Sequence, residues 1–121
     1  MGKTVLIVDD SMSIRQLVKA TLLTKGYTVV DACDGVDALK KLGLQRVNLV
    51  ISDVNMPNMD GITLLKAIKA KPEHRFTPVI MLTTESQEGM KREGQAAGAK
   101  AWIVKPFQPE LMLAAVEKLL M

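Results

Sequence analysis

Several polar side chains stand directly behind short apolar runs, and Asp53 is the best defined of them. Leu49, Val50 and Ile51 precede it in the chain, and Pro57 breaks the segment that follows. Such a run is typical of a strand that is buried on both faces. A carboxylate at the end of that strand has a rigid support and an adaptable loop beyond it. Asp53 can therefore be a reactive group, or it can merely end the strand and begin a turn.

The same arrangement recurs at other apolar runs. Asp9 and Asp10 follow the first run, Thr83 follows the fourth, and Lys105 follows the fifth. If these carboxylates lie together unpaired, their repulsion should raise the pKa of at least one. Mg²⁺ relieves such repulsion, since it takes one or two carboxylates and often a phosphate oxygen. A lysine and a hydroxyl could bind the remaining phosphate oxygens, so the set suits phosphoryl transfer, with a carboxylate as nucleophile.

These side chains can meet only if the intervening chain alternates between strands and helices. We expect strands at Thr4–Val8, Tyr27–Val30, 47–53, Val79–Leu82 and Ala101–Val104. We expect helices after Ser11, after Asp34-Gly35, after Asp60-Gly61, over Ser86–Ala97, and from about Pro109. Alternation of this kind predicts an α/β fold with a doubly wound, five-stranded parallel sheet. All carboxyl ends then share one edge, where ligands bind.

The helices should bury one face each. The residues expected to face inward are Ile14, Leu17, Val18, Leu22, Val36, Leu39, Leu42, Leu64, Leu65, Ile68, Met112, Ala115, Val116 and Leu119. The fourth helix should be weak, because Gly89 and Gly94 each cost about 1 kcal/mol relative to Ala. We expect His74 to be solvated in a polar loop, and Cys33 to be a small strand residue.

Composition narrows the class of protein. The chain has 121 residues and is 48% hydrophobic, which suits one domain with a core that needs no metal or disulfide. No apolar run approaches the ~18–20 residues of a membrane span, and no signal-peptide pattern is present, so we expect a cytoplasmic protein. A net charge of +3 with one Trp, one Tyr and two Phe argues against nucleic-acid binding.

Four motifs resemble those of the receiver domain of two-component response regulators. They are Val8-Asp9-Asp10-Ser11, Asp53-Val-Asn-Met-Pro-Asn-Met-Asp-Gly61, Leu82-Thr83-Thr84 and Val104-Lys105-Pro106-Phe107. The resemblance covers the whole chain, with the same order and spacing. It implies a flavodoxin-like (βα)5 fold with strand order 2-1-3-4-5. It also implies one receiver domain over residues 1–121.

The resemblance assigns a role to each acid. Asp53 matches the residue that accepts a phosphoryl group from a phosphohistidine on a sensor histidine kinase. Asp9 and Asp10 match the acids that hold Mg²⁺ together with Asp53, and the backbone carbonyl of Asn55 matches a further ligand. Asn55 and Glu85 match the residues that flank the attacking water, so they should set the lifetime of the phosphorylated state.

The resemblance also describes how the signal leaves the site. Thr83 matches the hydroxyl that moves to the phosphoryl group, and Lys105 matches the lysine that pairs with it. The Lys105–Pro106 peptide bond should be cis, a geometry that is cheap only before proline. Trp102 lies where the family usually has Tyr or Phe as the switch aromatic. We expect it to fill space left by Thr83 and so bias the last two helices and the strand between them.

The output remains open between several readings. We expect a monomer that binds a downstream protein and is not a turnover enzyme. The motifs are similar to the chemotaxis type, which implies a flagellar motor switch component as partner, although Thr84 replaces the common Ala. A phosphorelay shuttle is the alternative. An Mg²⁺-dependent phosphatase with an aspartate nucleophile would require an acid at position 55, where this chain has Asn55. A protein that serves only as a dimerisation scaffold would not need the acids and Lys105, which are all present.

Overall fold

Strands and helices alternate along the computed structural model, which describes residues 2–84, 87–106 and 108–121. In chain order they are β1 (Thr4–Val8), α1 (Met12–Leu23), β2 (Thr28–Ala32), α2 (Gly35–Leu44), β3 (Leu49–Ser52), α3 (Gly61–Ala70), the 3-10 helix η1 (Pro72–His74), β4 (Val79–Thr83), α4 (Glu88–Ala96), β5 (Ala101–Val104) and α5 (Pro109–Leu120). No helix in this part of the chain is long and apolar enough to cross a membrane.

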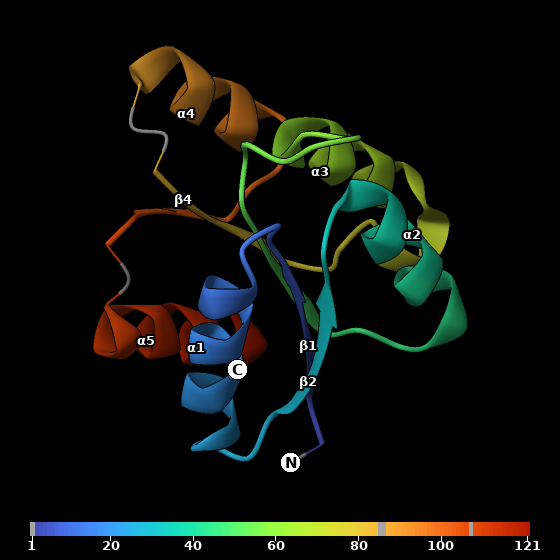
Figure 1. Ribbon diagram of the computed structural model, residues 1–121. Helices are drawn as coiled ribbons and strands as arrows, with labels where there is room; N and C mark the ends of the chain where they lie inside the picture. The colour runs from blue at the N-terminus through green and yellow to red at the C-terminus, as the bar shows by residue number, and fades with distance from the viewer. Residues whose placement is uncertain (1, 85–86, 107) are drawn as a thin grey trace.

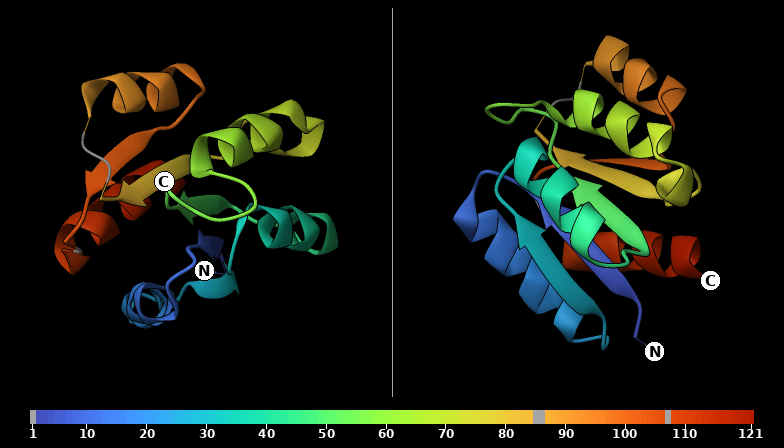
Figure 2. Two further views of the ribbon diagram at one scale, coloured as in Figure 1. Left: turned by 45° about the horizontal axis from the view of Figure 1, so that its top comes forward. Right: turned by 90° about the vertical axis from the view of Figure 1, so that its right-hand side faces the viewer.

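The five strands form one parallel sheet in the order β2-β1-β3-β4-β5. Helices α1 and α5 cover one face of the sheet, and α2, α3 and α4 cover the other (Figures 1 and 2). Each face has its own apolar cluster, because successive strand side chains point to opposite sides. The expected flavodoxin-like α/β fold and its strand order are confirmed.

Side-chain caps begin the first three helices, which follow β1, β2 and β3 along the chain. Ser11 accepts a hydrogen bond from the amide of Ile14 at 3.3 Å, and Asp60 accepts one from Thr63 at 2.8 Å. Asp34 caps α2 in the same manner. Such caps contribute about 1 kcal/mol each and fix where the chain turns from strand to helix. They therefore help to define the loops at the carboxyl edge of the sheet.

The ends of two elements differ slightly from expectation. Strand β2 runs over Thr28–Ala32 instead of Tyr27–Val30, so it reaches two residues further toward the carboxyl edge. Helix α4 begins at Glu88, while the expected start at Ser86 lies outside the described residues. Strand β3 is the buried core of the segment expected over 47–53.

Four expectations about single residues were wrong. Leu17 and Val36 are 47% and 49% exposed, because a helix lying on a sheet buries only a narrow stripe. His74 is buried in η1, where its Nδ1 lies 3.2 Å from Oγ1 of Thr77, so it belongs to the interior. Cys33 is exposed and follows the end of β2.

Candidate functional site

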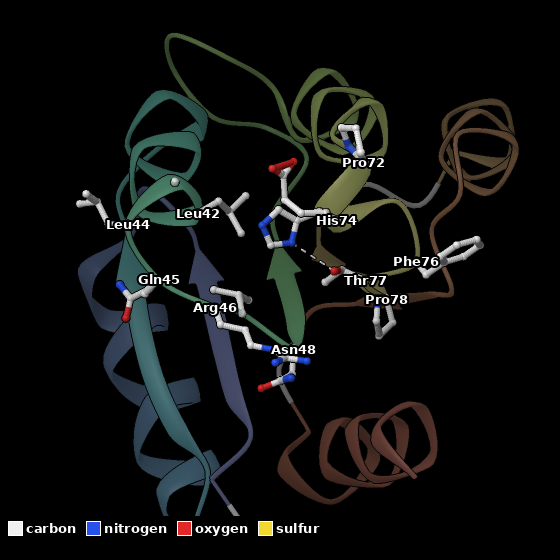
Figure 3. A pocket seen from close by; sticks show the side chains of 13 residues that line it. Leu42, Leu44, Gln45, Arg46, Asn48, Pro72, His74, Phe76, Thr77 and Pro78 are labelled. Carbon is white, nitrogen blue, oxygen red and sulfur yellow. Dashed lines mark hydrogen bonds between the residues drawn. The ribbon is translucent and has the colours of Figure 1, made fainter.

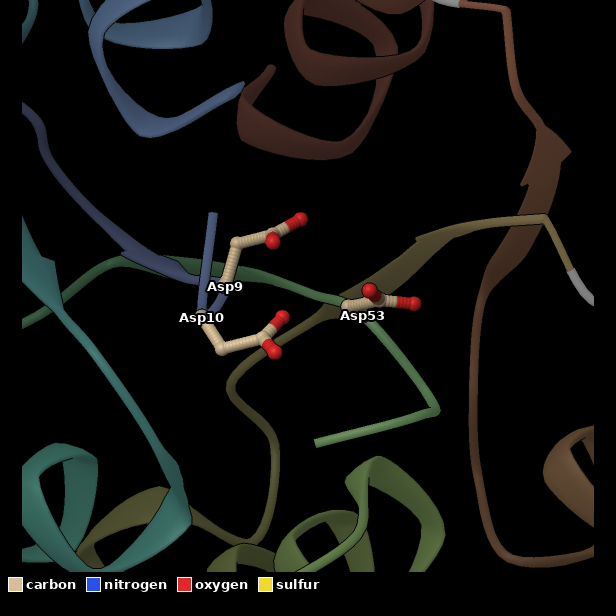
Figure 4. A group of neighbouring side chains, drawn as sticks. All are labelled: Asp9, Asp10 and Asp53. Atoms are coloured by element: carbon tan, nitrogen blue, oxygen red, sulfur yellow. The ribbon is translucent and has the colours of Figure 1, made fainter. Parts of the chain in front are cut away.

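Three carboxylates meet at the carboxyl edge of the sheet. One oxygen each from Asp9, Asp10 and Asp53 lies within 4.8 Å of the others. Figure 4 shows the three side chains gathered beside one another. The register of β1 and β3 pairs Val8 with Ser52, which places the next residue of each strand side by side. Asp9 and Asp53 are buried and Asp10 is exposed, so the cluster is open to solvent on one side.

Lys105 lies between two of these acids. Its Nζ is 3.0 Å from Oδ2 of Asp9 and 3.3 Å from Oδ2 of Asp53. The backbone amide of Lys105 donates to the carbonyl of Thr83 at 2.8 Å, and the Lys105–Pro106 peptide bond is cis, as expected. Burial lowers the pKa of Lys105, but the hydrogen bond to Asp9 and the two carboxylate charges outweigh it, so that pKa is raised.

The pKa of Asp9 is also raised, and burial is the main cause. A hydrogen bond from the Ser11 amide at 2.9 Å and the ammonium of Lys105 act in the opposite direction. The charge of Asp53 raises the pKa as well, but it is the smallest of these influences. The raised pKa expected from mutual repulsion is therefore present, although desolvation contributes more than repulsion to it.

The chain leaves β3 through a tightly built loop. Oδ1 of Asp53 accepts a hydrogen bond from the amide of Val54 at 2.7 Å, and the carbonyl of Val54 accepts one from Gly61 at 2.7 Å. A β-carbon on Gly61 would lie 2.0 Å from the carbonyl oxygen of Asp53, so only glycine fits there. Asn55 is exposed on this loop, two residues after Asp53.

The two residues expected to form the switch lie on neighbouring strands. Thr83 is the last residue of β4, is fully buried, and pairs in register with Val104 of β5. Trp102 is half-buried in β5 and packs against the cluster beneath α2, α3 and α4. Glu85 and Phe107 lie outside the described residues.

Arg15 supports the site, and sequence reasoning did not find it. Its Nη1 donates to the carbonyl oxygen of Asp9 at 2.6 Å, while its Nε lies 3.2 Å from Oδ2 of Asp31. The guanidinium therefore fixes the backbone from which Asp9 projects. The signal was available, because Arg15 shares a helix face with the buried residues Val18 and Leu22.

The donor set suits a hard divalent cation. Carboxylate oxygens are the ligands that Mg²⁺ prefers, and Mg²⁺ needs only one or two of them because it keeps several waters. Asp9, Asp10 and Asp53 offer such oxygens close together, with the exposed Asp10 on the solvent side. The residues present therefore fit Mg²⁺, and the ammonium of Lys105 neutralises part of the charge of Asp9 and Asp53.

A sizeable cavity lies elsewhere in the described part of the chain. It has a volume of about 700 Å³ and opens at the amino ends of β3 and β4, between the segments that follow α2 and η1 (Figure 3). Its lining includes Arg46, Asn48, His74 and Thr77. None of the clustered acids lines it, and in a parallel sheet its edge is opposite to theirs. This cavity is therefore separate from the carboxylate cluster.

The chain is similar to known proteins over nearly its whole length. The family model described as the response regulator receiver domain matches residues 5–117. The structure of chemotaxis protein CheY4 of Vibrio cholerae superposes with a TM-score of 0.93, at 47% identity over 98% of this chain and 99% of that one. Chemotaxis protein CheY of Pseudomonas aeruginosa is 35% identical over 95% of this chain and 94% of its own length.

Two further matches bear on the metal and on chain length. Response regulator TrrA of Thermotoga maritima, solved in complex with Mg²⁺ and BeF, is 33% identical, with a TM-score of 0.86 over 97% of this chain and 98% of that one. A transcriptional regulatory protein of Bacillus subtilis, PhoP, is 37% identical over 99% of this chain. The chain spans only 49% of that relative's length.

Proposed function

The chain belongs to the response regulator receiver domain family, and on this premise we propose that Asp53 accepts a phosphoryl group with the help of Mg²⁺. The proposed donor is a phosphohistidine on a sensor histidine kinase. The observation that carries the proposal is the cluster of Asp9, Asp10 and Asp53 with Lys105 beside it. We further propose that residues 1–121 form one receiver domain.

The proposed reaction is an exchange of one bond to phosphorus. A carboxylate oxygen of Asp53 attacks the phosphorus, forming an acyl phosphate, while the bond to the donor's imidazole nitrogen breaks. That nitrogen keeps the electron pair and takes a proton from solvent. Bound Mg²⁺ supplies positive charge to the phosphoryl oxygens. Asp9 and Asp10 would hold the ion, together with Asp53 and the backbone carbonyl of Asn55.

Lys105 and Thr83 are the proposed partners of the transferred group. Lys105 already lies 3.3 Å from Asp53, so a small movement lets its ammonium pair with a phosphoryl oxygen. Thr83 ends the neighbouring strand β4, from which its hydroxyl would donate to another oxygen. Trp102 would then follow Thr83 and alter the surface formed by α4, β5 and α5. Asn55 and Glu85 would set the lifetime of the acyl phosphate.

The proposed output is binding of another protein by a monomeric, cytoplasmic receiver. The similarity to the two chemotaxis proteins supports a chemotaxis role, with a flagellar motor switch component as partner. A phosphorelay shuttle is the alternative within this class. The chain would promote its own phosphorylation and dephosphorylation without being a turnover enzyme.

The rival from a different class is an Mg²⁺-dependent phosphatase that uses Asp53 as nucleophile. Such an enzyme wants a second acid two residues further on, where this chain has Asn55. Turnover of small phosphate esters would favour the phosphatase, and a stoichiometric reaction without turnover would favour the receiver.

The proposal is tested by incubating the protein with acetyl phosphate and Mg²⁺ and measuring its intact mass. We expect the wild type to gain one phosphoryl group and Asp53→Asn to gain none. Asp37→Asn, which removes a carboxylate on α2 outside the cluster, should behave like the wild type. No addition to the wild type, or equal addition to Asp53→Asn, would overturn the proposal.

A further inference from the structure

We propose that Asp34 and Asn58 are positioning residues that hold the loop after β3 ready for the metal ion. The loop comprises residues 53–61 and carries both Asp53 and Asn55. The inference rests on the proposed function, since it assigns these two residues a role in Mg²⁺ binding at that site. Neither residue belongs to the carboxylate cluster itself.

A single carboxylate joins the loop to helix α2. Oδ2 of Asp34 accepts a hydrogen bond from Nδ2 of Asn58 at 2.8 Å. Oδ1 of the same side chain accepts a hydrogen bond from the backbone amide of Asp37, also at 2.8 Å, and so caps the start of α2. Asp34 thus ties the outer part of the loop to the rigid end of a packed helix.

The backbone of Asn58 is suited to this contact. Its φ is 69°, and among the described residues it is the one non-glycine residue with positive φ. Asn tolerates this region better than other residues that have a β-carbon, because its short polar side chain bonds locally. The conformation is therefore one that the hydrogen bond to Asp34 helps to maintain.

A close contact beside this hydrogen bond fixes the same part of the loop. A β-carbon on Gly35 would lie 2.8 Å from both Cβ and Sδ of Met59. Because Gly35 has no side chain, Met59 and the loop can pack closely against the start of α2. At the base of the loop, Gly61 bonds to Val54 and lies against the carbonyl of Asp53. The loop is thus held at its base and at its outer end, with Asn55 between the two.

A loop held in this way loses less freedom when it binds a ligand. Ordering a flexible segment costs free energy at the moment of binding, and a segment that is already ordered avoids that cost. If the Asn55 carbonyl is a metal ligand, the hydrogen bond from Asn58 to Asp34 should strengthen Mg²⁺ binding without touching the ion. The hydrogen bond should restrict the loop most in the metal-free protein, because a bound ion would itself order the loop.

Two substitutions separate this hydrogen bond from the other roles of the same residues. Asn58→Gly removes the side-chain amide that donates to Asp34 but keeps a residue that readily adopts positive φ. Asp34→Ser keeps a cap oxygen for α2 but leaves none for Asn58. We expect each to weaken Mg²⁺ binding roughly fivefold by calorimetric titration, the effect of one lost hydrogen bond. Amide hydrogen exchange over 55–59 in the metal-free protein should become faster.

The double variant tests whether the two residues act together. If they act through one shared hydrogen bond, Asp34→Ser combined with Asn58→Gly should weaken binding no further than either alone. Gly35→Ala should also weaken binding, because its β-carbon displaces Met59, whereas Gly43→Ala on the same helix meets no atom within 4 Å and should not.

The outcomes distinguish this inference from the proposed function. A wild type that binds Mg²⁺ with variants of unchanged affinity and unchanged exchange would overturn the positioning role alone. Additive losses in the double variant would also overturn it. A wild type that binds no Mg²⁺ would overturn the proposed function and this role with it.

Discussion

The indole of Trp102 occupies the space that a β-carbon on Gly94 would need. Such a carbon would lie 2.6 Å from Cζ3 of the ring, well inside van der Waals contact. Gly94 is buried in α4, and Trp102 is half-buried in β5 on the same side of the sheet. The glycine that makes α4 a weak helix by propensity therefore makes room for the proposed switch aromatic.

Gly94→Ala should displace the ring of Trp102. Overpacking costs about 1–3 kcal/mol, and the gain in helix propensity offsets about 1 kcal/mol, so the free energy of unfolding should fall slightly. Tryptophan emission should shift to longer wavelength as the ring moves toward water. Gly89→Ala is the matched control, since its β-carbon meets nothing within 4 Å and should only stabilise α4. Equal emission spectra for the two variants would contradict the contact.

Lys105→Met should destabilise the metal-free protein. The substitution leaves Asp9 and Asp53 without the cation that lies within 3.3 Å of both. Breaking a buried pair in this way costs about 3 kcal/mol. Chemical denaturation should show the loss, and Mg²⁺ should restore most of it by supplying another cation. Lys100→Met, at an exposed site, is the control, and equal losses for both variants would contradict the prediction.

Asp10→Asn should stabilise the metal-free protein. It removes one of three carboxylates whose oxygens lie within 4.8 Å of one another, and because Asp10 is exposed, solvent limits the repulsion to about 1 kcal/mol. The melting temperature should rise, and its further rise on adding Mg²⁺ should shrink or vanish. Glu110→Gln changes the net charge equally but lies in the first turn of α5, where an acid is favourable, so it should not stabilise. A lower melting temperature for Asp10→Asn would contradict this account.

Asp34 should titrate below its usual pKa of 3.8. The amide of Asp37 is the main cause, and the side chain of Asn58 is the second. Because the folded state lowers this pKa, the contribution to stability is fully present above pH 3.8 and is lost as the pH falls through the folded-state value. Carboxyl-carbon NMR should show the low pKa, and Asn58→Gly should raise it while leaving it below 3.8. An identical pKa in both proteins would show that Asn58 does not contribute.

The features predictable from the sequence are those that follow from strand direction. Apolar runs mark the strands, and parallel strands must bring their carboxyl ends to one edge, so the meeting of Asp9, Asp53 and Lys105 could be expected. The role of Arg15 could not, because it depends on how far a side chain reaches across the layers. The burial of His74 likewise depends on how η1 folds back, which local polarity does not reveal.

Some glycine roles can be predicted from local sequence, and others depend on tertiary packing. A glycine after a helix or at a turn has a local meaning, and Asp60-Gly61 correctly predicted the start of α3. The close approach of Gly94 to Trp102 and of Gly35 to Met59 joins residues that are distant in sequence or lie in different elements. Such contacts form only when the helices pack on the sheet. Helix propensity alone therefore predicted that Gly94 destabilises α4, and did not reveal its contact with Trp102.

The position of Lys105 has a consequence for the chain as it is synthesised. The first acids leave the ribosome early, but the cation that lies between Asp9 and Asp53 follows β5, the last strand of the sheet. Until that strand has emerged and paired with β4, a nascent chain carries the acids without their counter-ion. We therefore expect nascent chains not to accept a phosphoryl group from a donor. Each molecule should be able to accept one only when its sheet is complete.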